Sequence, residues 1–187
     1  MKYFTPQLWI AFQGPRRNAA FKTWERRLEQ YRKSIQDILP SLRPSARRFF
    51  RNALILHDGT VTRMEVGDRI DDIGGRATRN IVNRRALRIR LFVLADVVRR
   101  RHIIGKCWYI LEYKQVERID LSFPGDLELF PDGFDPNLGH WGYDELTSPK
   151  KNLFRHEVLF ASGASITIDF RDFSFRCRKP AKDRRGR

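Results

Sequence analysis

Apolar side chains in the first third of the chain recur at helical spacing. Between residues 18 and 39 most of them lie three or four positions apart, and charged residues occupy most of the remaining positions. Pro40 ends this pattern, and Pro44 suits the first turn of a second helix. The pattern predicts two helices, at about 18–39 and 44–57, that form an α-hairpin.

The apolar period changes to that of a β-strand near residue 60. Strict alternation of apolar and polar residues marks 87–91 and 165–170. Similar runs cover 60–66, 107–113, 116–123 and 154–160, and Trp141, Tyr143 and Glu145 also have a strand-like pattern. The apolar parity slips by one position between Phe170 and Phe173, which predicts a bulge or a strand break there.

Strands that follow one another without intervening helices favour an antiparallel sheet, with any helices segregated to one face or end. The predicted fold class is α+β, with the N-terminal α-hairpin packed on a mainly antiparallel β-sheet formed by the C-terminal two-thirds of the chain. A chain of 187 residues is long enough to bury one sufficient core. We expect a single domain over residues 1–177 and a disordered basic tail over 178–187, because the tail has almost no apolar content.

No apolar run in the sequence approaches the length of a membrane-spanning helix, and the run at 8–12 is too short for a secretory signal. These observations favour a soluble, cytoplasmic protein. Cys107 and Cys177 have no CxxC spacing. A bridge between them is geometrically possible, but reduced cysteines are the commoner state in the cytoplasm, so we expect both to be reduced.

The net charge of +15 at pH 7 is distributed unevenly along the chain. Residues 76–106 hold ten basic side chains and one acidic side chain, and residues 176–187 hold seven and one. Residues 107–175 instead hold six basic and twelve acidic side chains. The molecule therefore offers surfaces of both signs, and each can attract a partner of the opposite charge.

The basic segment 76–106 is the sharpest feature of the sequence. Its candidate phosphate-binding residues are Arg84, Arg85, Arg88, Arg90, Arg99, Arg100 and Arg101. The strand period sends Arg88 and Arg90 to one face, where spaced arginines can follow a phosphate backbone. Platforms for single-stranded nucleic acid usually add exposed aromatic residues, and residues 76–106 contain only Phe92. The segment therefore predicts either a nucleic-acid-binding face or an ordinary solvated surface.

Carboxylates crowd into residues 130–145, but they lack the spacing of a metal site. A calcium loop that began at Asp132 or at Asp135 would place non-ligand residues at required positions. His140 and His156 lie in no zinc-ligand spacing, and the chain has no nucleophile elbow and no phosphate-binding glycine loop. Turn chemistry explains the cluster better. We therefore expect no catalytic residue, no metal site and no cofactor.

The first residues, MKYFT followed by Leu8 and Trp9, resemble the start of a family of uncharacterised bacterial proteins. The runs YILEYKQVERIDL, HWGYDEL and FRHEVLFASGASITIDFRDF are similar to the β-rich halves of small bacterial proteins, some of them proposed as toxin-neutralising immunity proteins. The resemblance implies a bacterial binding protein and assigns no site residue.

The acidic β half contains the candidate surface for a protein partner. Trp141, Tyr143, Asp144 and Glu145 combine aromatic anchors with carboxylates, which suits a protein interface. The same residues also fit the core of a strand. The first hypothesis is a non-enzymatic cytoplasmic protein that recognises a protein partner through these residues. The alternative is binding of RNA or DNA through the arginine-rich segment and the basic tail.

Overall fold

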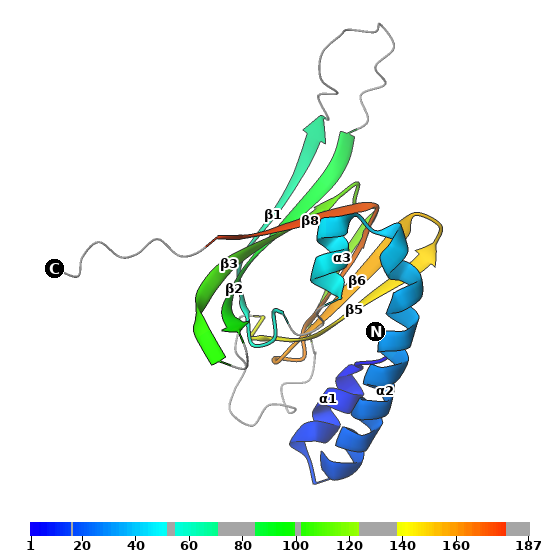
Figure 1. Ribbon diagram of the computed structural model, residues 1–187, viewed down its shortest axis with the longest axis vertical. Coiled ribbons are helices and arrows are strands. Elements are labelled where there is room, and N and C mark those ends of the chain that lie inside the picture. The colour runs from blue at the N-terminus through cyan, green and yellow to red at the C-terminus, as the bar shows by residue number, and fades with distance from the viewer. Residues whose placement is uncertain (16, 52–54, 71–84, 100–101, 124–137, 179–187) are drawn as a thin grey trace, which may run out of the picture.

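A computed structural model shows two antiparallel sheets, preceded along the chain by three helices (Figure 1). It describes residues 1–15, 17–51, 55–70, 85–99, 102–123 and 138–178. The predicted α+β class is confirmed, but the strands divide into two four-stranded sheets. The predicted tail lies outside the described residues from position 179 onward.

The first sheet has the strand order β1-β2-β3-β8. Its strands are β1 (Thr60–Ile70), β2 (Arg85–Arg99), β3 (His102–Lys114) and β8 (Asp172–Arg178). In β2, Ile89 and Leu91 are fully buried, and the partly exposed Arg88 and Arg90 alternate with them. The sheet therefore has an apolar inner face and an outer face that carries arginines.

The second sheet has the strand order β4-β7-β6-β5. Its strands are β4 (Arg118–Ser122), β5 (Trp141–Lys150), β6 (Leu153–Phe160) and β7 (Ser165–Phe170). The predicted hairpin between β6 and β7 is confirmed, and Gly163 adopts the positive φ of 79° at its turn. The predicted strand break is also confirmed, because β7 ends at Phe170 and β8 begins at Asp172 in the other sheet.

The helices are α1 (Pro6–Gln13), α2 (Arg17–Ile38) and α3 (Pro44–Phe50), with a 3-10 turn η1 (Leu39–Ser41) after α2. The helix predicted at 18–39 is confirmed as α2, whereas the helix predicted at 44–57 ends as α3 at Phe50.

The apolar pattern does not predict α1, but a capping signal is present. The side chain of Thr5 accepts a hydrogen bond from the N–H of Leu8, and Pro6 is the first helical residue. α1 packs along α2, α2 contacts β5, and α3 packs on β8. The most extensive helix–helix packing is thus between α1 and α2. None of the described helices is long and apolar enough to cross a membrane.

The main core lies where the inner faces of both sheets meet α3. The rings of Tyr113, Phe170 and Phe173 pack with centroids 5.1 to 5.9 Å apart. Phe50 of α3 contacts His156 of the second sheet and Phe173 of the first, at 5.0 and 4.9 Å between ring centroids. α3 therefore holds the two sheets together. The burial of these aromatic rings is the main source of the free energy that stabilises the packing of one sheet on the other.

The expectation of two reduced cysteines is wrong in this structure, which joins Cys107 and Cys177 in a disulfide. Tyr109 of β3 lies opposite Cys177 of β8, so Cys107 lies diagonally across from Cys177 on the same side of the sheet. Their Cα atoms are 6.0 Å apart, a usual separation for a bridge. The strand register that creates this proximity is not visible in the cysteine spacing.

Candidate functional site

The residues predicted to contact a protein partner do not form an exposed patch. Trp141 is 1% exposed and Glu145 is 0% exposed. Tyr143 is half-buried, and its ring centroid lies 5.3 Å from that of Phe4 and 5.9 Å from that of Trp9. These side chains are packing groups of β5, so their burial argues against the predicted partner surface.

Glu145 anchors the N-terminal segment to the second sheet. Its carboxylate accepts hydrogen bonds from the backbone N–H groups of Lys2, Tyr3 and Phe4 at 2.5 to 2.7 Å. Glu157 lies opposite Glu145 on β6, and its carboxylate accepts a hydrogen bond from the N-terminal ammonium at 2.6 Å. Burial raises the pKa of Glu145, although the hydrogen bonds from the backbone N–H groups oppose this effect. Both carboxylates therefore have structural partners.

Asp144 belongs to a buried hydrogen-bond chain that links the two sheets. The hydroxyl oxygen of Tyr113 lies 2.7 Å from Nδ1 of His156, and Nε2 of His156 lies 3.0 Å from Oδ2 of Asp144. The indole N–H of Trp141 donates to Oδ1 of Asp144 at 3.2 Å. Burial raises the pKa of Tyr113 well above its ordinary value. His156 is 0% exposed, and its two hydrogen-bond partners satisfy both ring nitrogens within the core.

The carboxylates of residues 130–145 lie only partly within the described residues. Asp132 and Asp135 are outside them, and the ring of exposed His140 lies 3.3 Å from the hydroxyl of Thr60. Within the described ranges, no group of three or more histidine, cysteine, aspartate or glutamate side chains could hold a metal ion.

The predicted arginines do not form one cluster along β2. Arg85 and Arg99 stand at its two ends, separated by roughly 45 Å of ideal strand. Arg84, Arg100 and Arg101 lie outside the described residues. Arg88 and Arg90 are the members of this set whose side chains are described, and both lie on the outer face of the first sheet.

Strand pairing adds residues from β1, β3 and β8 to Arg88 and Arg90. We call the resulting surface the arginine face. It consists of Arg63, Glu65, Arg88, Arg90, Phe92, Trp108, Ile110, Glu112, Lys114, Asp172, Ser174, Arg176 and Arg178. Six of these side chains are basic and three are acidic, so the face has an excess of three positive charges. Such an excess attracts polyanions.

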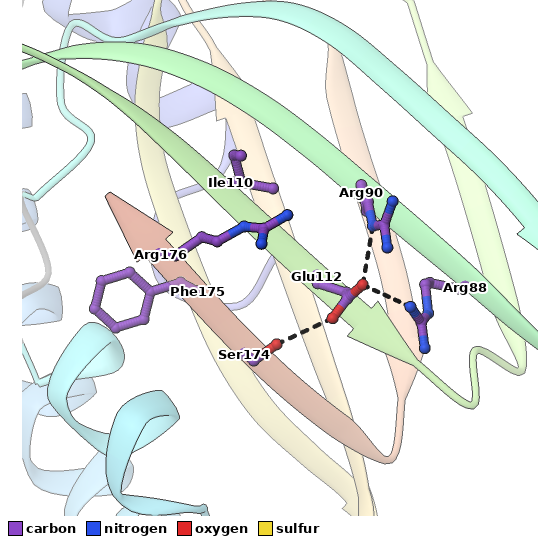
Figure 2. Close-up of a pocket in the computed structure, with 7 residues that line it drawn as sticks. All are labelled: Arg88, Arg90, Ile110, Glu112, Ser174, Phe175 and Arg176. Carbon is purple, nitrogen blue, oxygen red and sulfur yellow. Dashed lines mark hydrogen bonds and ion pairs between the residues drawn. The ribbon is translucent and has the colours of Figure 1, made fainter. Parts of the chain in front are cut away.

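A polar hollow occupies one part of the arginine face (Figure 2). Its volume is about 240 Å³. At its centre, Oε1 of Glu112 accepts hydrogen bonds from Arg88 at 2.8 Å and Arg90 at 2.9 Å. Ser174 donates to Oε2 of the same carboxylate at 3.3 Å, while Arg176 extends over the hollow from β8. Arg88 and Arg90 are therefore already partly neutralised, whereas exposed Arg176 has no ion-pair partner among the described residues.

The ionisation state of the Glu112 carboxyl group follows from these contacts. Burial favours its neutral form, but the hydrogen bond from Arg90 and the charges of Arg88 and Lys114 outweigh burial and hold the pKa below its ordinary value. Glu112 is thus an anion at neutral pH, and it repels a second anion placed directly beside it.

An apolar hollow adjoins the polar one, and Ile110 lines both. Its volume is about 470 Å³, and its other lining residues are Thr62, Arg63, Phe92, Trp108 and Arg178. The guanidinium of Arg63 lies 3.9 Å from the centroid of the Phe92 ring. The hollow therefore combines a floor of apolar side chains with arginines contributed by the two edge strands, β1 and β8.

The sequence pattern did contain one signal for Trp108, the second aromatic residue of the arginine face after Phe92. Half-buried Trp108 lies between Cys107 and Tyr109 in β3, and both of these neighbours are buried. The period of β3 thus sends Trp108 to the outer face, but only the pairing of β2 with β3 brings it near Phe92. The presence of Arg63 and Arg178 on this face follows only from the order of all four strands in the first sheet.

Comparison with known proteins found no matching family model, no matching curated protein and no matching solved structure. The resemblance noted in the sequence therefore stays a prediction, and the candidate site rests on the geometry of this chain.

Proposed function

We propose that this chain is a non-enzymatic protein that binds nucleic acid through its arginine face. The observation that carries the proposal is the position of Phe92 and Trp108 on the same sheet face as Arg63, Arg176 and Arg178. Arginine-rich sheet faces with accessible aromatic residues suit a ligand that has both phosphates and bases.

Charge distribution supports this proposal over a plain solvated surface. Arg176 and Arg178 are exposed at the end of β8, and the chain continues from there into the basic segment 179–187. A run of cations that begins on a folded face extends the electrostatic attraction for a phosphate backbone.

We do not propose a protein-binding surface at Trp141, Tyr143, Asp144 and Glu145. Trp141 and Glu145 are fully buried, and the side chains of Tyr143 and Asp144 pack within the fold. The cytoplasmic location stays a prediction. Disulfides are rare in the cytoplasm, so the bond between Cys107 and Cys177 does not support this location.

Fluorescence anisotropy with a labelled mixed-sequence DNA and its RNA counterpart, at two salt concentrations, tests the proposal. We expect binding at low salt that weakens steeply as salt rises, because each phosphate contact releases counterions. Substitution of both Arg176 and Arg178 by alanine should reduce the slope of log affinity against log salt by roughly 0.7–0.9 per arginine.

The double substitution Arg26→Ala and Arg32→Ala is the matched control. Both residues are exposed on α2, so this variant loses the same charge away from the arginine face. It should retain most of the affinity. The proposal is refuted by absence of binding at low salt, or by equal losses in the two variants.

A further inference from the structure

The two hollows of the arginine face differ in chemistry although they adjoin. The polar hollow has Glu112 at its centre, held by Arg88 and Arg90. The apolar hollow contains no carboxylate among its lining residues, and its floor is formed by Phe92, Trp108 and Ile110. A ligand that carries only negative charge would leave this apolar floor unused, whereas a nucleotide has both an anionic part and an aromatic part.

The paired side chains of Arg63 and Phe92 offer a surface on which an aromatic ring of the ligand can stack. The guanidinium of Arg63 already lies over the phenyl ring, 3.9 Å from its centroid, so the two side chains form one surface that combines a positive charge with an aromatic ring. Half-buried Trp108 offers a second aromatic surface from the neighbouring strand. Nucleobases stack on both aromatic rings and guanidinium planes.

The position of the carboxylate limits where a phosphate can lie. Ionised Glu112 repels a phosphate beside Arg88 and Arg90, whose charges it already partly neutralises. Arg176 and Arg178 stand on β8 and form no ion pair with any other described residue, and both line a hollow. The phosphates are therefore drawn to the β8 side, next to the apolar hollow.

From this arrangement we infer that the arginine face binds a single strand, with one unpaired base in the apolar hollow and its flanking phosphates at Arg176 and Arg178. The inference rests on the proposed function and goes further by naming the strandedness of the ligand. A duplex keeps its base faces stacked inside the helix, so it presents no free base to Phe92 and Trp108.

A set of four polyanions of equal net charge tests the inference. The probes are an oligo-dT strand, the same strand with abasic sites, a mixed-sequence duplex, and a heparin fragment of matched charge. The full chain should bind oligo-dT more tightly than the other three. Trp108→Ala should lower the affinity for oligo-dT by about 5- to 100-fold and leave the affinity for the abasic strand nearly unchanged.

Trp108→Phe is the second variant, because it retains an aromatic ring and guards against a loss of folding. It should recover most of the affinity for oligo-dT. Equal affinity for oligo-dT, abasic strand and duplex would overturn the inference and leave the proposed function intact. Equal affinity for heparin, with no effect of Trp108→Ala, would also overturn it. Failure of all four probes to bind at low salt would instead overturn the proposed function as well.

Discussion

At the scale of single residues, several buried and half-buried charges are matched by specific partners. On the outside of the second sheet, Arg155 donates to both oxygens of Asp169, at 2.7 and 2.8 Å. The hydrogen bonds from Arg155 hold the pKa of Asp169 below its ordinary value, in spite of the opposing effect of burial. This bidentate pair differs from the exposed pair Arg118–Asp120 on the neighbouring strand, where both side chains reach solvent.

Asp169→Asn should lower the free energy of unfolding by about 1–3 kcal/mol at neutral pH, because it removes a charge-assisted bidentate contact. A depressed folded-state pKa contributes stability that is present above the unfolded pKa and is lost as pH falls through the folded value. The difference between the native chain and the variant should therefore shrink below about pH 4. Urea denaturation at neutral and acid pH measures both effects.

Asp120→Asn is the matched control for this residue-scale prediction. Because Arg118 and Asp120 are about half exposed, their ion pair should contribute less than about 1 kcal/mol. A loss for Asp120→Asn as large as that for Asp169→Asn would contradict the assigned difference between the two pairs.

At the scale of elements, backbone contacts decide where the strands begin. Gly59 precedes β1, and its carbonyl accepts a hydrogen bond from the N–H of Trp141 at 2.6 Å. This contact places the start of β1 beside the start of β5, so the two sheets approach each other here. A Cβ atom at Gly59 would lie 2.8 Å from the carbonyl oxygen of Leu56 and 2.9 Å from a methyl group of Val93.

Gly59→Ala should therefore destabilise the fold by about 1–3 kcal/mol, because backbone and core atoms would have to move. Gly67→Ala within β1 is the control, since a Cβ atom there meets nothing within 4 Å. Gly67→Ala should leave the free energy of unfolding unchanged or raise it slightly. Thermal unfolding of the two variants compares the positions directly, and a similar melting temperature for both would contradict the steric argument.

At the scale of the whole molecule, β8 connects the arginine face to the rest of the fold. It follows β7 of the second sheet, pairs with β3 of the first, and carries Arg176 and Arg178. The disulfide between Cys107 and Cys177 ties its end to β3 and closes a segment with a sequence separation of 70. The bond restricts the unfolded chain as well as holding the strand.

Reduction of this disulfide should lower the free energy of unfolding by about 2–4 kcal/mol. Urea unfolding with and without reductant measures the loss, and mass spectrometry after alkylation counts the free thiols. Cys177→Ser is the control variant, because its stability should not respond to reductant. An equal response of the native chain and of this variant would contradict the role assigned to the bond.

Local patterns in the sequence predicted α2, the alternating strands, the β6–β7 turn and the strand break after Phe170, because each depends on residues within a few positions of one another. The start of α1 also has a local signal, at Thr5 and Pro6. The C-terminal end of α3 does not follow from the apolar pattern, which continued beyond Phe50.

The sequence alone determined the α+β class and the surplus of arginine, since composition and periodicity are properties of the chain itself. Only the tertiary structure decided that Trp141 and Glu145 are buried and that Trp108, Arg63 and Arg178 share a face with Phe92. The physical reason is strand register. Which residues of β1, β3 and β8 lie beside β2 depends on pairing between segments that are distant in sequence, and that pairing is selected by the packing of the whole core.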